Sequence, residues 1–369
     1  MDSKDLTVSA DELRTMLENK ERVVVLDVRP QEQRKEWQIP GSIYVDAYKR
    51  LNANDPTVLN EIEIPENTKV VTVCAAGRTS QIAANELRKK GIDAYSLKDG
   101  MKGWSLAWNT AYRQFDGFDI WQLRRTGKGC LSYIVISGKE AIIIDASLPV
   151  DVYEQLVKQN RLVIKYVIET HIHADHLSRS KELAEKFQAP LYLPSPNKVQ
   201  FNFNPITANT VFRIGALDLL SIPTPGHTME SFSFYIKGQV LFTGDTLFTN
   251  GVGRPDLKSS AEESNEKAKL LFHSLQAILS LPGNVVILPA HTNNPSDFDN
   301  KLIQTTVDQA KENIQMLRHS EEEFINQLLQ KIPPTPPNFL TIVEKNITGN
   351  YDGINPIDLE AGANRCAIS

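Results

Sequence analysis

The segment HIHADH at residues 171–176 constrains the fold of this chain more than any other stretch of its sequence. It holds three of the chain's seven histidines, His171, His173 and His176, together with Asp175. The apolar run LVIKYVIET leads directly into this segment and predicts a buried strand. A packed group of imidazoles is costly to remove from water unless a cation binds it. The segment therefore predicts a metal site at the end of a strand.

Further candidate ligands follow later strands of the chain. His227 in TPGHT, Asp245 in FTGDT and His291 in LPAHT each come after an apolar run that stops in a Gly or Pro turn. We expect these side chains to meet the HIHADH segment at the mouth of a β-sandwich, where such ligands can hold two metal ions about 3.5 to 4 Å apart. His273 and His319 fit no such pattern, and we expect both on helix surfaces.

The first part of the chain, residues 1–112, predicts a small parallel α/β domain. The β-branched runs at 23–28 and 69–73 and the stretch at 91–97 predict strands, and residues 81–91 predict a helix between the last two strands. A strand, helix, strand order of this kind is typical of a right-handed βαβ unit. Since the chain has 369 residues and a domain takes roughly 150, a second domain must follow.

Residues 113–300 predict short strands in sequential pairs with helices outside them, as in a layered αββα sandwich. A charged amphipathic helix is expected over 302–331, where PPTPP at 333–337 stops it. The chain from 301 to 369, with an apolar stretch after these prolines, is expected to pack on the second domain.

Cys74 ends a predicted buried strand and precedes a predicted helix, a position where ligands gather in open parallel sheets. The short loop CAAGRTS contains Gly77, so backbone N–H groups can turn toward the sulfur, and Arg78 and the helix N-terminus favour a thiolate. Such a thiolate can carry a persulfide. The alternative is an inert cysteine packed at a strand end.

The stretches LDVRPQEQRKEWQIPGSIYV, VCAAGRTS and LKDGMKGW together resemble the rhodanese domain over about the first 110 residues. The resemblance implies that Cys74 is the sulfur-carrying residue of a sulfurtransferase. A tyrosine-phosphatase loop would need an arginine six positions after the cysteine, where Ser80 stands, so phosphoryl transfer is disfavoured. The loop has Thr79 where many rhodaneses have arginine.

The series HxHxDH, His, Asp, His over roughly residues 120–300 resembles the metallo-β-lactamase superfamily. The resemblance implies two neighbouring metal sites that share Asp245. Their other ligands would be His171, His173 and His227 in one site, and Asp175, His176 and His291 in the other.

Two members of that superfamily fit the ligand set. In the first, two zinc ions activate a water for hydrolysis of a thioester or ester, as in glyoxalase II. In the second, His171, His227 and Asp245 alone bind one Fe(II) ion per chain and leave open positions for O2 and a persulfide, as in the persulfide dioxygenases.

Two features favour iron. The stretch GVGRPDL, with Arg254 and Asp256, is similar to the GxGRxD segment of persulfide dioxygenases, which suggests that Arg254 binds substrate. A persulfide-carrying cysteine joined to an oxidative site can also hand over the same sulfane sulfur. We therefore predict a sulfur-metabolism enzyme that couples sulfane-sulfur transfer to oxidation of a low-molecular-weight thiol persulfide to sulfite. A dinuclear zinc hydrolase with an accessory rhodanese domain is the alternative.

The composition limits the possible partners. Lysine and arginine number 40 against 45 aspartates and glutamates, a net charge of -5, so nucleic acid is not an expected partner. The longest apolar runs are strand-sized, so no membrane association is expected, and the charged start MDSKDLTVSADELRTML does not resemble a signal peptide. Because the chain has only three cysteines, we expect a reducing, cytoplasmic setting. The predicted chemistry implies a thiol persulfide or other sulfane-sulfur donor as the small-molecule partner. The sequence is also compatible with a homo-oligomer.

Cys130 and Cys366 have no clear motif. We expect both to be ordinary packed residues, and the sharper alternative is a relay thiol that receives sulfur from Cys74.

Overall fold

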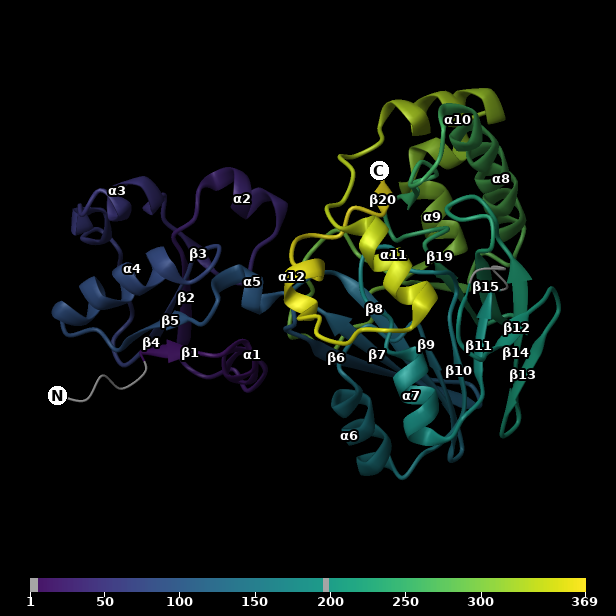
Figure 1. Cartoon of the computed structure of the whole chain (residues 1–369), viewed down its shortest axis with the longest axis horizontal. Helices are drawn as coiled ribbons and strands as arrows, with labels where there is room; N and C mark the ends of the chain where they lie inside the picture. Colours follow the sequence, from purple (N-terminus) through teal and green to yellow (C-terminus); the bar gives the residue numbers. More distant parts are fainter. Residues whose placement is uncertain (1–5, 195–198) are drawn as a thin grey trace.

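The computed structural model describes residues 6–194 and 199–369. Its N-terminal domain is built on a fully parallel five-stranded sheet (Figure 1). The strand order is β1 (Thr7–Val8), β5 (Ala94–Leu97), β4 (Lys69–Val73), β2 (Val23–Asp27) and β3 (Ile43–Tyr44). The predicted strands at 23–28, 69–73 and 91–97 are therefore the three central strands. Their β-branched side chains suit a sheet that is covered on both faces.

Helices cover both faces of this sheet. On one face, α3 (Tyr48–Asn52) and α4 (Arg78–Lys89) pack their buried side chains, such as Leu51 and Leu87, against the strands. On the other face, α1 (Ala10–Glu18) and α5 (Gly100–Trp104) contribute Leu13 and Trp104. The short helix α2 (Gln31–Glu36) lies between β2 and β3 in sequence and buries none of its residues.

The second domain contains two sheets that pack face to face. The seven-stranded sheet has the order β12 (Asn204–Ile206), β11 (Leu191–Pro194), β10 (Val163–Ile168), β9 (Glu140–Ile144), β8 (Cys130–Ser137), β7 (Phe118–Arg125) and β6 (Asn109–Phe115). The six-stranded sheet has the order β13 (Val211–Ile214), β14 (Leu217–Pro223), β15 (Phe232–Ile236), β16 (Val240–Gly244), β18 (Val286–Pro289) and β19 (Thr305–Thr306). Apolar residues from both sheets, among them Tyr133 and Phe242, form the core between them.

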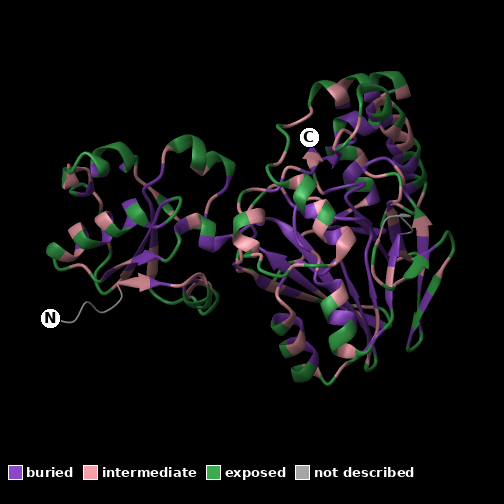
Figure 2. Ribbon diagram, in the orientation of Figure 1, coloured by how far each residue is buried: buried purple, intermediate pink, exposed green. Residues whose placement is uncertain are grey.

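Helices form the two outer layers of this domain. The helices α6 (Val150–Asn160) and α7 (Ser180–Phe187) cover the seven-stranded sheet. The helices α8 (Ala261–Leu279), α9 (Val307–Asn313) and α10 (Glu321–Gln330) cover the six-stranded sheet. Figure 2 shows the strands largely buried and the outward faces of these helices exposed. The layers are those of an αββα sandwich.

Two details of the chain differ from the sequence-based expectation. The strand β6 begins at Asn109, so the expected domain boundary at residue 112 falls inside the first strand of the second domain. The expected helix over 302–331 is instead broken into β19, α9, a 3-10 helix at Gln315–Arg318 and α10. The break occurs at Ile314, whose extended backbone turns the following Met316 and Leu317 into the core. Thr306 and Ser320 cap the separate helices.

Two further histidines, His273 and His319, lie outside the predicted ligand set. His273 is exposed on α8, as expected. His319 lies instead at the end of the 3-10 helix, between it and α10, so the expectation of a helix-surface position is wrong for this residue.

The C-terminal segment lies on the second domain as α11 (Phe339–Thr348), α12 (Pro356–Glu360) and β20 (Ala367–Ile368). The strand β20 pairs antiparallel with β17 (Val252–Gly253). In Figure 1 this segment, in yellow, crosses the domain and brings α12 next to α5. The Lys102 ammonium of α5 lies 2.5 Å from the Asp358 carboxylate of α12.

Buried hydrogen bonds join the two domains. The Trp37 indole N–H donates to the carbonyl oxygen of Thr126 at 3.0 Å, and the Arg125 Nε–H donates to the carbonyl oxygen of Ser105 at 2.8 Å. Phe298 of the second domain packs against the core of the first. These contacts form part of an interface between the two domains. Among the described residues, every helix is too short or too polar to serve as a membrane span.

Candidate metal centre and cysteine site

Three predicted ligands, His171, His227 and Asp245, converge at the ends of β10, β14 and β16. Their ligand-type atoms lie within 4.8 Å of one another, and all three side chains are buried. The Asp245 Oδ2 atom lies 3.7 Å from His171 Nε2 and 3.5 Å from His227 Nε2. Two ring nitrogens and one carboxylate oxygen therefore point at one location from three sides, and we call this group the iron-type face.

Neighbouring groups fix the orientation of both imidazoles in this face. The Thr170 hydroxyl donates to Asp145 Oδ2 at 2.9 Å, so its oxygen accepts from His171 Nδ1, which lies 2.9 Å away. His227 Nδ1 lies 2.8 Å from the Arg254 carbonyl oxygen, which can only accept. Each ring thus carries its proton on Nδ1 and turns the lone pair of Nε2 toward Asp245. Such partners on the far nitrogen are usual for metal-binding histidines.

The protonation states suit a cation in the iron-type face. Burial lowers the pKa of both His171 and His227, so their imidazoles are neutral. Burial alone would raise the pKa of Asp245, but the neighbouring His291 and the other imidazoles lower it well below the ordinary range. Asp245 Oδ2 is buried without a hydrogen-bond partner. Because a buried carboxylate oxygen is costly to leave unpaired, these three residues fit a divalent metal ion.

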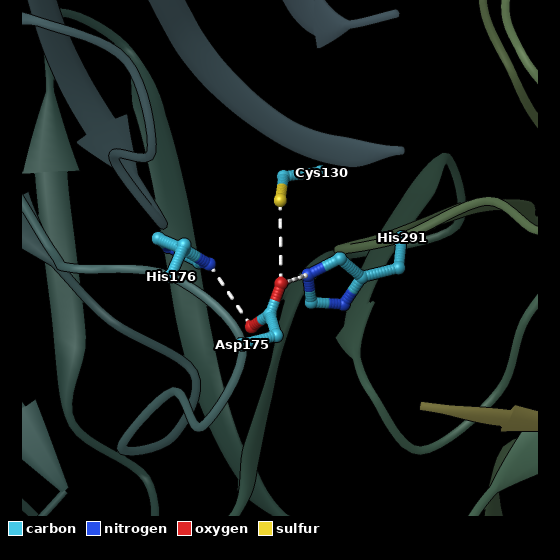
Figure 3. Close-up of side chains that lie close together, drawn as sticks. All are labelled: Cys130, Asp175, His176 and His291. Atoms are coloured by element: carbon cyan, nitrogen blue, oxygen red, sulfur yellow. Dashed lines mark hydrogen bonds and ion pairs between the residues drawn. The ribbon is translucent and has the colours of Figure 1, made fainter. Parts of the chain in front are cut away.

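A second group lies on the other side of Asp245 and contains Cys130, Asp175, His176 and His291 (Figure 3). Asp175 is central to it. Its Oδ2 atom lies 2.9 Å from His291 Nε2 and 3.3 Å from Cys130 Sγ, and its Oδ1 atom lies 3.0 Å from His176 Nδ1. We call these residues the thiol-containing group.

Cys130 is the residue that sequence reasoning missed. It begins β8, and its backbone forms an isolated bridge with that of His291. Burial and the Asp175 carboxylate raise the pKa of its thiol, but His176 and His291 outweigh them and lower this pKa to about 7. The signal in the sequence is only its place at the start of a strand, which does not show that the strand faces the histidine cluster.

The ring of His173 lies beside that of His171, with the two ring centres 4.2 Å apart, but its Nε2 atom is directed away from Asp245. Its Nε2 atom lies 3.3 Å from Asp145 Oδ1 and 3.4 Å from Glu169 Oε2. Burial lowers the pKa of His173, and these two carboxylates outweigh that effect and raise it. The structure therefore pairs His173 with acidic residues, and a metal-ligand role for it stays a prediction.

The C-terminal segment holds the HIHADH loop in place. The Asn346 side-chain amide of α11 donates to the carbonyl oxygens of His173 and His176, both at 2.8 Å. Glu360 of α12 accepts the backbone N–H of Leu177 at 2.8 Å and lies 2.6 Å from the fully buried Arg125. The irregular loop thus takes its backbone partners from residues far along the chain.

The tail also reaches the thiol-containing group. Asn364 donates from its side-chain amide to Asp175 Oδ2 at 3.0 Å. Cys366 is buried, with its sulfur close to Asp245 and His291. Burial raises the pKa of the Cys366 thiol well above its ordinary value. Cys130 and Cys366, the two cysteines without a motif, therefore both lie beside the candidate metal centre, although one precedes and the other follows the predicted ligands in sequence.

Arg254 is fully buried and holds this tail. Its guanidinium forms two 2.8 Å contacts with Asp256 and donates to the carbonyl oxygens of Pro333, Pro334 and Arg365. Its backbone N–H donates to the backbone carbonyl oxygen of Cys366 at 3.0 Å. These contacts give Arg254 a structural role beside the centre, and substrate binding by its side chain stays a prediction.

A cleft of about 670 Å³ leads to the iron-type face beside His227. Ile172 and Phe232 line one part of it, and Phe339, Val343 and Ile347 of α11 line another. Glu230, Lys258 and Lys267 also line the cleft, so a small molecule that enters it meets both apolar and charged side chains before it reaches His227.

The Cys74 site lies at the carboxyl end of β4. The backbone N–H of Gly77 donates to Cys74 Sγ at 3.2 Å, and the Ser80 hydroxyl lies 3.3 Å from the same sulfur. Gly77 has a left-handed φ of 92°, and Gly100 packs so closely that an added Cβ would lie 2.2 Å from the Cys74 carbonyl oxygen. The loop is therefore preformed around the sulfur. Arg78 is exposed at the start of α4, and its effect on the thiolate stays a prediction.

The fold and the site define a protein of the αββα class that has a candidate metal centre and carries a separate cysteine-loop domain. A family model described as metallo-beta-lactamase superfamily matches residues 125–291, and one described as rhodanese-like domain matches residues 9–107. The chain belongs to the metallo-beta-lactamase superfamily and has a rhodanese-like domain at its N-terminal side. Both resemblances and the predicted fold class are thereby confirmed.

Curated relatives include both hydrolases and a dioxygenase. The chain is 32% identical to the probable polyketide biosynthesis zinc-dependent hydrolase BaeB of Bacillus velezensis, over 52% of this chain and 82% of that protein. It is 31% identical to the mitochondrial persulfide dioxygenase ETHE1 of Mus musculus, over 57% and 79%. It is 29% identical to a hydroxyacylglutathione hydrolase of Tolumonas auensis, over 58% and 78%. A beta-lactamase hydrolase-like protein of Xylella fastidiosa is matched over only 48% of its length.

Two crystal structures share the second domain's fold. A metallo-beta-lactamase from Staphylococcus aureus aligns with a TM-score of 0.57 at 27% identity, over 65% of this chain and 74% of that one. ETHE1 from Myxococcus xanthus aligns with a TM-score of 0.52 at 28% identity, over 61% and 95%.

Proposed function

We propose that this chain is a persulfide dioxygenase joined to a sulfurtransferase domain. In this proposal His171, His227 and Asp245 hold one Fe(II) ion, and the second domain oxidises a low-molecular-weight thiol persulfide to sulfite. The observation that carries the proposal is the iron-type face itself. It offers two histidines and one carboxylate, whereas His173 faces Asp145 and Glu169 instead. The similarity to the persulfide dioxygenase ETHE1 of Mus musculus and to ETHE1 of Myxococcus xanthus supports it.

The chain's own residues prepare the site for this reaction. Bound iron would supply the means to bring O2 and a sulfur ligand together on the open side of the face. Asp145, through Thr170, keeps the His171 lone pair directed inward, and the Arg254 carbonyl does the same for His227. The apolar side chains of the cleft would pack against the substrate next to the face. In the overall reaction the sulfane sulfur is oxidised, dioxygen is reduced, water supplies the remaining oxygen of sulfite, and the thiol is released.

The first domain would transfer the same kind of sulfur. The Cys74 thiolate attacks the sulfane sulfur of a donor, a new S–S bond forms at Cys74 Sγ, and the donor's S–S bond breaks to release its thiolate or sulfite. The Gly77 N–H and the Ser80 hydroxyl stabilise negative charge on Cys74 Sγ. A thiol acceptor then takes the sulfur by the reverse chemistry.

A dinuclear zinc hydrolase is the second candidate. The presence of Asp175, His176 and His291 on the far side of Asp245 favours it, because a hydrolase would use these residues for a second ion. The similarity to a zinc-dependent hydrolase and to a hydroxyacylglutathione hydrolase also supports it.

One experiment separates the two. Protein purified without oxygen is analysed for metals, and oxygen uptake is measured after a thiol persulfide is added. We expect about one iron per chain and uptake that depends on His171. Two zinc ions per chain together with thioester cleavage and no uptake would replace the dioxygenase with the hydrolase. A His273→Ala variant is the matched control, since His273 is exposed on α8.

A further inference from the structure

We infer that the persulfide substrate carries its sulfur on an apolar arm that ends in a carboxylate, rather than on a peptide. This inference rests on the proposed function and deepens it, because that function specifies only a low-molecular-weight thiol persulfide. The cleft beside His227 is the basis for it, since the lining of this cleft divides into an apolar side and a charged side.

The helix α11 provides a continuous apolar stripe to the cleft. Phe339, Val343 and Ile347 recur at every fourth residue, so their side chains lie one above another on a single face of the helix. All three are only partly buried, whereas Ile342 and Asn346 on the neighbouring face are buried. The stripe therefore leaves apolar surface in the cleft that an apolar ligand would remove from water.

Apolar residues of the sandwich line the same cleft. They are Ile172 of the HIHADH loop, Ile206 of β12 and Phe232 of β15. Met229, which is 58% exposed, follows two residues after His227 and lines the cleft as well. A hydrocarbon arm is apolar along its whole length and fits such walls. A peptide carries amide groups, which are costly to bury against these side chains without hydrogen-bond partners.

The charged side of the cleft contains two lysines in different surroundings. Lys267 of α8 donates to the Ser259 hydroxyl at 2.7 Å and to the Leu257 carbonyl oxygen at 3.4 Å, and the Glu230 carboxylate lies near it. Lys258 is exposed, and its ammonium forms no ion pair or hydrogen bond with any residue that the structure describes. Lys258 is therefore the cation that the cleft can offer to a ligand.

The balance of charge favours a carboxylate over a phosphate. A phosphate monoester carries a charge of about -1.5 to -2 at neutral pH, and Glu230 in the same lining would repel it more strongly than a carboxylate. A contact between an exposed lysine and a carboxylate contributes little affinity. The apolar arm thus provides most of the affinity, and Lys258 sets its direction, with the sulfur at His227 and the carboxylate at Lys258.

Thioether analogues test this inference without turnover, because they lack the sulfane sulfur. Binding of 8-(methylthio)octanoate, 3-(methylthio)propanoate and S-methylglutathione to the full-length protein is measured by calorimetry without oxygen. We expect the octanoate to bind at least about 10-fold more tightly than either of the others, because its longer arm covers the stripe. Equal affinity for the octanoate and the propanoate would overturn the inference, and so would tighter binding of S-methylglutathione.

Val343→Thr tests the apolar stripe. It replaces one methyl group by a hydroxyl, so the ratio of octanoate to propanoate affinity should fall about 3- to 10-fold. Leu340→Thr is the matched control, since Leu340 is 53% exposed on the same helix and is not among the described residues that line the cleft. Its ratio should match that of wild type. Equal changes in both variants would place the arm outside the stripe and overturn the inference.

Lys258→Met tests the carboxylate end. The alcohol 8-(methylthio)octan-1-ol has the same arm without the charge, and wild type should bind it about 2- to 5-fold more weakly than the octanoate. Lys258→Met should remove this difference, and a preference that persists would overturn the assignment of Lys258. These ratios do not depend on oxygen uptake. A protein that oxidises glutathione persulfide but lacks the expected ratios would keep the dioxygenase proposal and lose the proposed substrate class.

Discussion

The two reactive regions of the molecule are built in opposite ways. The Cys74 site is local, since its sulfur, its loop amide at Gly77 and the Ser80 hydroxyl all lie within seven residues. The candidate metal ligands follow β10, β14, β16 and β18, which are far apart in sequence, and the C-terminal tail holds the HIHADH loop. The difference teaches that the first site depends on a turn, whereas the second depends on the folding of the entire second domain.

The largest effects are expected when one reactive residue is removed from each region. Asp245→Asn should abolish iron binding and reduce oxygen uptake by at least about 100-fold, because the face loses its only anionic donor. Sulfur transfer by Cys74 should stay unchanged. Cys74→Ser should give the reverse pattern, with sulfur transfer lost and iron content retained. Loss of both activities in either variant would show that the two regions are not independent.

The tail contact is tested by Glu360→Gln. This change leaves Arg125 buried without a counter-charge, so we expect the free energy of unfolding to fall by about 3 to 5 kcal/mol. Urea unfolding of the full chain measures it. Glu36→Gln is the matched control, since Glu36 pairs with Arg365 at the surface and should cost less than about 1 kcal/mol. Equal losses of the free energy of unfolding would show that the buried Glu360–Arg125 pair stabilises the docked tail no more than the surface pair does.

The same ion pair predicts a pH dependence. Burial raises the pKa of Glu360, but Arg125 and Arg179 outweigh it, so the folded-state pKa lies below the ordinary glutamate value. The stability that Glu360 contributes is therefore present above its unfolded-state pKa and lost as the pH falls through the folded-state pKa. Urea midpoints measured from about pH 6 down to about pH 3, a range that reaches below the ordinary glutamate pKa, should fall more steeply for wild type than for Glu360→Gln.

A smaller effect is expected at Thr170, which orients His171. Thr170→Val removes the hydroxyl that accepts from His171 Nδ1 and donates to Asp145, so iron affinity should fall about 10- to 100-fold. Thr72→Val is the control in the other domain, where the hydroxyl donates to the Ser80 carbonyl oxygen. Competition with an iron chelator measures the iron affinity of both variants. Unchanged iron affinity in Thr170→Val would contradict the orienting role.

The smallest effect belongs to the local site. Ser80→Ala removes one hydroxyl next to Cys74 Sγ, which corresponds to about 0.5 to 1.5 kcal/mol and a rate of sulfur transfer about 2- to 10-fold lower. Iron content should not change. If Ser80→Ala lowered the rate of sulfur transfer by a larger factor than Thr170→Val lowers iron affinity, the Cys74 site would be the more sensitive of the two regions.

The sequence allowed prediction of features that one segment encodes by itself. HIHADH, His227, Asp245 and His291 follow strands directly, and the Cys74 loop is recognisable from its own residues. The helix α8 went unpredicted, although Ser260 and Glu263 form a capping box that marks its start. Capping boxes at Thr306 and Ser320 likewise mark the break in the expected helix over 302–331.

The remaining features depend on long-range packing. Cys130 reaches the centre because its backbone pairs with His291, a neighbour that no local pattern specifies. Asn346 and Glu360 reach the HIHADH loop because α11 and α12 dock on the second domain. His173 turns to Asp145 and Glu169, and only their positions in space distinguish it from His171.

The dependence of the HIHADH loop on Asn346, Glu360 and Asn364 sets an order of maturation. Because ribosomes synthesise a chain from its amino end, the rhodanese-like domain can fold while most of the second domain is still unmade. The HIHADH loop can form its last backbone hydrogen bonds only after Asn346 and Glu360 have been synthesised. A cell that interrupts translation before residue 364 would hold a fragment with a finished sulfur carrier and an unfinished cation site.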